Sequence, residues 1–262
     1  MVKEKKLFSI IMPAFNASKT ISSAINSVLN QTIKDWELII VNDNSKDNTL
    51  EIIKKFSLNS TKIKVINLVF NVGAATARNI AIKKSKGRFI AFLDSDDYWF
   101  PKKLEKQLDI FMKEFGYPIV FSNFIMKKNN SENKSKEFIF EEKVNFKNII
   151  KTNSIATSTA VYDTNIISRQ YFPNLKQRHD WALWLKILKK NKKYYAFCVQ
   201  EPLVAIIKNK ESLSSNRLRS FYFNFKVLRL YSSSSFLFSL WSVFFNVIRV
   251  FFRRVKAGFF SF

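Results

Sequence analysis

Three carboxylates stand together in the stretch IAFLDSDDYWF, at Asp94, Asp96 and Asp97. The chain has 44 basic and 20 acidic residues, so this cluster is costly unless a cation or water compensates the repulsion. A hard divalent cation binds one or two carboxylates and completes its shell with phosphate and water. Metal binding by Asp94 and Asp96 is one interpretation. A solvated acidic turn that caps the helix after Pro101 is the other, and it fits Asp97 better.

The composition restricts the kind of metal site. The chain has one histidine, His179, and one cysteine, Cys198, so it cannot form a multi-histidine or all-cysteine metal centre or an internal disulfide framework. Any bound metal must be held by oxygen ligands, which indicates Mg²⁺, Mn²⁺ or Ca²⁺.

Two further polar residues follow apolar runs in the first half. Asp43 ends the run in IIVNDNS, where it either forms an Asx-turn or accepts a hydrogen bond from a nucleobase imide N–H. Arg78 follows a predicted helix start at 73–75, where exposed backbone N–H groups favour phosphate. The alternative for Arg78 is an ordinary arginine on a helix surface.

His179 and Asp180 precede the helical pattern WALWLKIL. Asp180 suits an N-cap by type and place, and a carboxylate in a cleft can also act as general base toward an attacking hydroxyl. The two roles are compatible. The lone His179 is better explained as a positioning or structural residue than as a metal ligand.

The first 110 residues alternate between two patterns, and the polar residues above follow the apolar runs. Strands are predicted at Phe8–Met12, Glu37–Val41, Lys64–Leu68 and Phe89–Leu93, and helices at Ala17–Asn30, Asn48–Phe56, Ala74–Ser85 and from Pro101. This order predicts an α/β fold with a mainly parallel sheet. The polar clusters 13–16, 42–45, 71–79 and 94–97 then all lie at the carboxyl ends of strands, where open α/β sheets bind ligands.

The second half is less regular. We predict strands at Ile119–Phe124, 155–163 and Tyr194–Val199, and a helix at Trp181–Leu188. The expected organisation is a domain over 1–212, with a nucleotide-binding half (1–110) and an acceptor or catalytic half (111–212), and a helical tail over 213–262.

The tail carries the stretch FLFSLWSVFFNVIRVFF at Phe236–Phe252, followed by basic residues. An aromatic helix with basic flanks suits the membrane interface, and packing on the protein or spanning are the alternatives. Residues 1–110 carry 18 basic and 11 acidic side chains, and residues 111–262 carry 26 and 9, which favours anionic partners for the second half. The N-terminus does not resemble a signal peptide, so we expect a cytoplasmic protein, peripheral at the membrane.

Six segments together resemble the family 2 glycosyltransferases of GT-A fold. They are SIIMPAFN, SVLNQT, WELIIVNDNSKDNT, NVGAATARN, KGRFIAFLDSDDYWFPKKLEKQ and RHDWALWLKIL. The resemblance implies an inverting, metal-dependent transferase with a nucleotide-sugar donor, usually a UDP-sugar, and Mn²⁺ or Mg²⁺. Charge and tail favour a lipid-linked glycan acceptor in surface polysaccharide synthesis.

The resemblance also implies roles for individual residues. Pro13, Ala14, Phe15 and Asp43 would hold the base, Asp94 to Asp96 the ribose and the metal diphosphate, and Asp180 would be the catalytic base. The remaining candidates are Gly73, Arg78 and Ser95 for the nucleotide, and Arg178, His179, Lys208 and Lys210 for the diphosphate or acceptor. Loops 122–124 and 153–160 would shape the donor pocket.

Two other function classes are the alternatives. A sugar-phosphate nucleotidyltransferase could use a similar sheet and metal, but it would carry a glycine-rich loop where this chain has PAFNASKT. A non-enzymatic protein that binds nucleic acid or anionic membrane would explain the charge, but an RNA-binding aromatic signature is absent. P-loop and dinucleotide glycine motifs are also absent.

Overall fold

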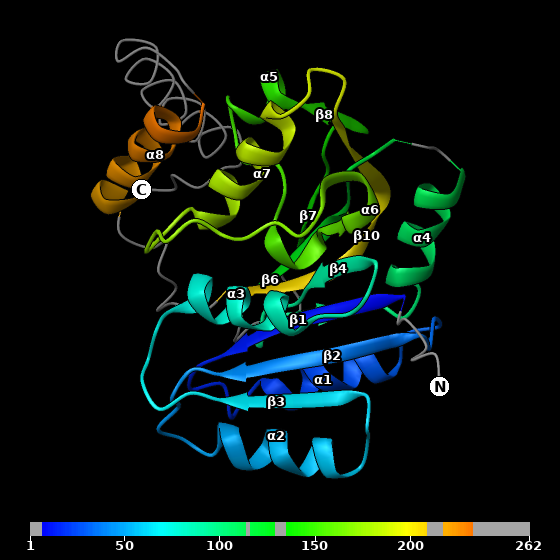
Figure 1. Ribbon diagram of the computed structural model, residues 1–262, viewed down its shortest axis with the longest axis vertical. Helices are drawn as coiled ribbons and strands as arrows, with labels where there is room; N and C mark the ends of the chain where they lie inside the picture. Colours follow the sequence, from blue (N-terminus) through cyan, green and yellow to red (C-terminus); the bar gives the residue numbers. More distant parts are fainter. Residues whose placement is uncertain (1–6, 114–115, 129–134, 209–216, 233–262) are drawn as a thin grey trace, which may run out of the picture.

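A computed structural model describes residues 7–113, 116–128, 135–208 and 217–232 (Figure 1). Its centre is a mixed sheet with the strand order β3-β2-β1-β4-β9-β6-β10-β5. Helices pack on both faces of this sheet, so the molecule has three layers. This arrangement confirms the predicted α/β class.

The first half forms the regular, parallel part of the sheet. Its strands are β1 (Phe8–Ala14), β2 (Trp36–Asn42), β3 (Ile63–Asn67) and β4 (Phe89–Phe92). β1 pairs in parallel with β2 and β4, and β2 pairs in parallel with β3. All four predicted strands are confirmed, with ends shifted by one or two residues.

The protein has two hydrophobic cores, and successive residues of β1 belong alternately to one and the other. Ile11 belongs to the core under α3, whereas Ile10 and Met12 belong to the core under α1. The helices of the first half are α1 (Ile21–Leu29), α2 (Thr49–Leu58), α3 (Ala74–Lys84) and α4 (Lys103–Lys113). Because strand side chains alternate between faces, both sides of β1 are buried, which explains its continuous apolar run.

The second half completes the sheet with mixed pairing. Its strands are β5 (Tyr98–Trp99), β6 (Ile119–Lys128), β7 (Ser135–Phe138), β8 (Lys143–Asn145), β9 (Val161–Asp163) and β10 (Tyr195–Lys208). Among the described strands here, only β6 and β10 pair in parallel; β9 is antiparallel to both β4 and β6. The sheet is therefore mainly parallel in the first half alone.

Two predictions for the second half need correction. The segment 155–163 is not one strand: a short 3-10 turn, η1 (Thr157–Thr159), precedes β9. Ser158 in this turn donates its hydroxyl to Asp97, so these residues contact the site instead of extending the sheet. The strand predicted at Tyr194–Val199 is longer in the structure: β10 continues past Pro202 to Lys208, with register shifts on both sides of Pro202.

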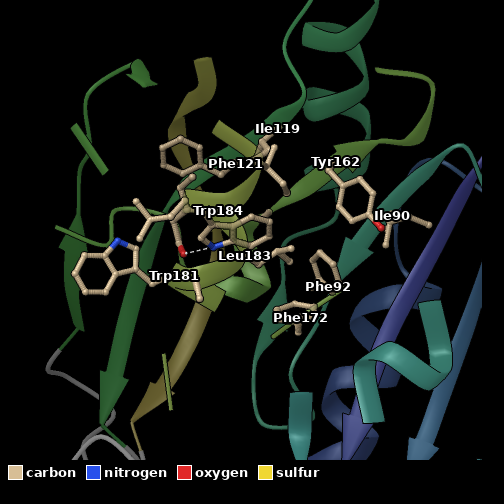
Figure 2. Close-up of a cluster of buried hydrophobic side chains, with 14 of the residues drawn as sticks. Ile90, Phe92, Ile119, Phe121, Tyr162, Phe172, Trp181, Leu183 and Trp184 are labelled. Atoms are coloured by element: carbon tan, nitrogen blue, oxygen red, sulfur yellow. Dashed lines mark hydrogen bonds between the residues drawn. The ribbon is translucent and has the colours of Figure 1, made fainter. Parts of the chain in front are cut away.

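Helix α7 (His179–Lys189) anchors the second half on the sheet. Trp184 contacts Phe92 and Phe172 edge-on, within the buried cluster shown in Figure 2. The remaining helices are α5 (Phe146–Ile149), α6 (Thr164–Ile167) and α8 (Arg217–Tyr231). Val227 and Leu228 of α8 are buried in the same core as α7.

The prediction for Phe236–Phe252 lies outside the described residues, and the division of the chain at residue 212 stays a prediction. Within the described ranges, every helix is too short or too polar to span a bilayer.

Candidate active site

The loops after β1, β2, β3 and β4 meet at one edge of the sheet, as predicted (Figure 1). Asp43 is 3% exposed there, and its two carboxylate oxygens accept the backbone N–H groups of Val72 (2.7 Å) and Gly73 (2.9 Å). Asp43 therefore fastens the loop that precedes α3 to the end of β2. Gly73 has a φ of 83°, which favours glycine at this position.

Arg78 connects the two halves of the site. Its side chain is 5% exposed and forms an ion pair with Asp94 through Nη2. Its Nη1 lies 2.7 Å from Nε2 of His179, at the start of α7. The guanidinium also lies 5.3 Å from the ring centre of Phe172. Arg78 is thus a buried residue that joins the carboxylates after β4 to α7, and not an ordinary surface arginine.

The contacts of His179 define its protonation. A guanidinium only donates, so Nε2 of His179 must accept, and the ring proton lies on Nδ1, 3.3 Å from the Leu175 carbonyl oxygen. Burial and the adjacent Arg78 charge lower the pKa of His179 below its ordinary 6.5. Both ring nitrogens of His179 thus have partners within the protein, and its functional role stays a prediction.

Asp180 lies in the first turn of α7, beside the Arg78–His179 contact. Its Oδ2 accepts the side-chain amide of Asn153 at 2.9 Å. The N-cap is Arg178, with a left-handed φ of 61°, so the predicted capping by Asp180 is wrong. Asp180 comes two residues later, where its charge still complements the helix dipole.

Asp97 is not a helix cap either. Its carboxylate accepts the Ser158 hydroxyl (2.5 Å) and the Ile207 N–H (3.2 Å). At the start of α4, the Leu104 N–H instead donates to the Gln31 side chain. Burial, together with the charges of Asp94 and Asp96, raises the pKa of Asp97 well above its ordinary value. Asp97 therefore holds the loop between β4 and β5 against η1 and β10.

The loop of Asp94 and Asp96 suits a divalent cation in its chemistry. Both are partly exposed carboxylates, and their negative charge is strong enough to raise the pKa of the neighbouring Asp97. The described residues contain no group of three or more His, Cys, Asp or Glu side chains arranged to hold a metal alone. Two carboxylates with a substrate phosphate are the ligand set that Mg²⁺ and Mn²⁺ commonly use.

A pocket of about 340 Å³ borders the same loop on the side of α1. Asp96, Tyr98 and Ile207 line it together with two basic side chains, Lys19 and Lys127. Asp97 also lines it, so the pocket combines two carboxyl groups with two cations, which suits an anionic group that arrives with a divalent cation.

The other predicted site residues lie at the same edge of the sheet or outside the residues that the structure describes. Pro13 and Ala14 are buried at the end of β1, and Phe15 is 50% exposed. Ser95 lies between the two predicted metal ligands. Lys208 ends β10, and nothing is described of its side chain; Lys210 lies outside the described residues.

Sequence reasoning missed two side chains of the site, Asn153 and Ser158. Both lie in the segment 153–160, which was named as a pocket loop and was in part predicted to be a strand. The residues they contact, Asp180 and Asp97, are 27 and 61 positions away. No local pattern indicates such contacts. The structure marks the site in another way. Asn16, Asn44 and Arg178 have positive φ although they are not glycines, and they lie next to Phe15, Asp43 and His179.

Comparisons with known proteins identify the family of this chain. Residues 9–175 match the family model described as glycosyl transferase family 2. An Escherichia coli relative, UDP-Glc:alpha-D-GlcNAc-diphosphoundecaprenol beta-1,3-glucosyltransferase WfgD, is 40% identical over 71% of this chain and 71% of its own length. The putative teichuronic acid biosynthesis glycosyltransferase TuaG of Bacillus subtilis is 35% identical, over 84% and 86%.

Solved structures show the same fold. S. aureus TarS 1-349 in complex with UDP-GlcNAc has a TM-score of 0.68 and 26% identity, and the match covers 89% of this chain and 69% of the TarS 1-349 chain. Mannosyltransferase PcManGT from Pyrobaculum calidifontis, in complex with GDP-Man and Mn²⁺, has a TM-score of 0.64 over 98% of this chain and 77% of its own. At 14% identity, the latter shows the fold alone.

Proposed function

The chain belongs to glycosyl transferase family 2, and on that premise we propose that it transfers a hexose from a UDP-sugar to a hydroxyl of a lipid-linked glycan, with inversion. The observation that carries this proposal is the connection from Asp94 through Arg78 to His179, next to Asp180. It joins the carboxylates after β4 to the first turn of α7. The site thereby has a donor side and an acceptor side within one cluster.

The donor side is built from the loops after the four parallel strands. We propose that Phe15 and Asp43 contact the base and that Asp94 and Ser95 contact the ribose. Phe15 is half-exposed, so its ring is available for a planar ligand. Pro13, Ala14 and Gly73 shape the backbone around the base. Arg78 orients Asp94 toward the nucleotide.

The metal would be held by Asp96 and Asp94, with Mn²⁺ or Mg²⁺ as the candidates. Such a cation, once bound, supplies charge neutralisation on the diphosphate leaving group. Lys208 and Lys210 follow the pocket residue Ile207 in the sequence, and they are the candidate side chains for the same diphosphate. Arg178 and His179 stay candidates for the diphosphate or the acceptor.

Asp180 is the proposed general base. It would take the proton of the acceptor hydroxyl as that oxygen attacks the anomeric carbon from the face opposite the nucleotide. A single displacement of this kind inverts the anomeric configuration, so an α-linked donor gives a β-linked product. Burial and the adjacent Arg78 charge lower the pKa of His179, so His179 does not compete for the proton.

The relatives suggest the substrates. The E. coli relative is named for glucose transfer from UDP-Glc to GlcNAc-diphosphoundecaprenol, and the B. subtilis relative for teichuronic acid synthesis. We propose the same class for this chain: a UDP-hexose and an undecaprenyl-diphosphate-linked sugar, used at the cytoplasmic face of the membrane. The excess of basic residues after position 110 supports contact with anionic lipid.

Calorimetric titration tests the donor side. UDP is titrated with and without Mn²⁺ into the wild type and Asp96→Ala, with GDP as the control nucleotide. We expect Mn²⁺-dependent UDP binding that Asp96→Ala weakens by about 100-fold, because one of two ligand carboxylates is lost. Binding of GDP alone would move the donor to GDP-sugars. Failure of folded protein to bind either nucleotide would overturn the proposal and favour a basic surface-binding protein.

Transfer itself is then measured with UDP-glucose and a GlcNAc-diphosphate-lipid. A β-linked disaccharide product is expected. An α-linked product would contradict the single displacement.

A further inference from the structure

Helix α8 packs on the second half with one face and, within the described residues, leaves its other face exposed (Figure 1). Val227 and Leu228 are fully buried in the core that also contains the tryptophans of α7. On the outer face, Tyr222 is 57% exposed and Leu230 is 60% exposed. Phe221, at the flank of this face, is 39% exposed. A single helix therefore presents three large apolar side chains outward.

Basic side chains share the outer face of α8. Residues three or four positions apart lie above one another on a helix, so Tyr222, Lys226 and Arg229 fall on one side. The Lys226 ammonium lies 6.0 Å from the centre of the Tyr222 ring, and Arg229 is exposed. The helix sequence RLRSFYFNFKVLRLY has four basic residues and no acidic one. The outer face thus combines aromatic and aliphatic groups with positive charge.

This combination favours the surface of an anionic bilayer over other partners. Nucleic acid is bound by cationic and aromatic side chains, and an exposed leucine gains little from it. A second copy of α8, packed face to face, would bring like charges together. At a bilayer interface, in contrast, tyrosine lies at the headgroup level, leucine enters the acyl boundary, and lysine meets the lipid phosphates.

The sequence that follows α8 has the same character. From Arg217 onward the chain has eight basic residues and no acidic one. The stretch Phe236–Phe252, which lies outside the described residues, has thirteen large apolar residues among seventeen. Positive charge and apolar composition therefore continue from α8 into the tail, as an anionic bilayer that contacts both would require.

We propose that the outer face of α8 lies in the interface of an anionic bilayer, through Tyr222, Lys226 and Leu230. This goes beyond the proposed function because it assigns membrane contact to one surface of the described fold. α8 packs on α7, which carries Asp180 in its first turn. The contact would therefore hold α7, and the proposed base on it, at the bilayer that contains a lipid-linked acceptor. This consequence, unlike the contact itself, rests on the proposed function.

Flotation with lipid vesicles tests the contact. The protein is mixed with vesicles of phosphatidylglycerol and phosphatidylcholine, or of phosphatidylcholine alone. We expect binding to the anionic vesicles that high salt weakens, because lipid charge and apolar insertion both contribute. The double variant Tyr222→Ser/Leu230→Ser should lower the partition coefficient by about 10-fold or more, and Lys226→Glu should lower it by about 10-fold.

Two variants of α2 are the matched controls. Leu58 is 85% exposed, Lys55 is also exposed, and α2 lies at the opposite end of the molecule from α8 (Figure 1). Leu58→Ser and Lys55→Glu make similar chemical changes without touching α8, so vesicle binding should stay within about twofold of the wild type. Equal losses in the control and α8 variants would show that net charge and overall apolarity govern binding, and would overturn the contact.

Other occupants of the outer face would give different results. Unchanged vesicle binding with a lower unfolding midpoint in the α8 variants would show that another part of the chain covers this face. A change of oligomeric state in light scattering would show that a second copy covers it. Wild-type binding to a single-stranded oligonucleotide but not to anionic vesicles would assign the face to nucleic acid. Each of these results would overturn the inference.

Transfer assays separate this inference from the proposed function. With a lipid-linked acceptor in anionic vesicles, the double variant should transfer about 10-fold more slowly than the wild type. With a water-soluble, short-chain acceptor the two rates should match, because the donor and acceptor residues are unchanged. Vesicle binding by a wild type that neither binds UDP nor transfers sugar would overturn the proposed function and support the contact. Undiminished vesicle binding and transfer in the double variant would overturn the contact alone.

Discussion

Each end of the parallel strands holds a carboxylate beside a basic side chain. The two carboxylates differ in how many of their hydrogen bonds the protein itself supplies. At the amino end, Glu37 is 2% exposed and accepts the Ser9 hydroxyl and the Lys86 N–H at 2.6 Å each, as well as the ammonium of Lys64. At the carboxyl end, Asp94 pairs with Arg78 but keeps 33% of its side chain exposed.

This contrast shows what a carboxylate needs for each role. Glu37 is enclosed by three donors, so it stabilises the fold and offers nothing to a ligand. Asp94 is held in place on one side and open on the other. We therefore expect substitutions at the carboxyl end to reduce activity with little loss of stability, and substitutions at the amino end to do the reverse.

The largest effect should come from Asp180→Asn, in the first turn of α7 beside the Arg78–His179 contact. Removing a general base should lower kcat by about 10²- to 10⁴-fold, because the acceptor hydroxyl then attacks with its proton in place. Asparagine keeps the size of the side chain, so UDP affinity and the unfolding midpoint should match the wild type. Transferase assays and calorimetry check both parts. Full activity in this variant would remove Asp180 from the mechanism.

Gly87→Ala should have the largest effect at the amino end. A Cβ at Gly87 would lie 2.5 Å from the Ser9 nitrogen and 2.6 Å from the Phe8 carbonyl carbon, both of which are backbone atoms that cannot easily move. We expect a loss of about 2 kcal/mol in the free energy of unfolding, measured by urea denaturation. Activity per folded molecule should not change.

Gly116→Ala is the matched control for Gly87. At Gly116 a Cβ would meet nothing within 4 Å, but φ is 106°, so the substitution tests backbone strain without a clash. Its cost should be about 1 kcal/mol. A larger loss at Gly116 than at Gly87 would contradict the close packing of the amino end.

The effect of Glu37→Gln on stability should depend on pH. Burial raises the pKa of Glu37, but hydrogen bonds from Lys64, Ser9 and Lys86 lower it more, so it lies below its ordinary 4.5. The unfolded chain then binds this proton more readily than the folded protein, and acid favours unfolding. This part of the stability is present above pH 4.5 and lost as the pH falls through the folded pKa.

Urea denaturation at pH 7, 5 and 3 measures that difference. Glu37→Gln should lose about 1–2 kcal/mol at pH 7, and the gap to the wild type should close toward pH 3. Parallel stability curves for the two proteins would show that Glu37 does not titrate as its hydrogen bonds require.

The positions of the proposed donor-side residues could be predicted from sequence because these residues are tied to strand ends. Asp43 and Asp94 each follow a short buried run, and parallel strands place such positions at one edge. The pattern therefore placed these side chains within one site without any knowledge of their contacts. The same pattern predicted the four strands and the helices between them, which the structure confirms.

The acceptor side could not be predicted in the same way. Asn153 and Ser158 reach the site through pairing of β9 with β4 and β6, which no periodicity in the sequence indicates. The errors at Asp97 and Asp180 have the same origin. Each residue suits a helix cap locally, but its partner comes from a distant segment that only the tertiary fold supplies.

The bond from the Ile207 N–H to Asp97 has a consequence for protein synthesis. The two residues are 110 positions apart, so the loop of Asp94 and Asp96 reaches its final form only after β10 has left the ribosome. A nascent chain of the first half carries the donor residues but lacks the Ser158 and Ile207 partners of Asp97.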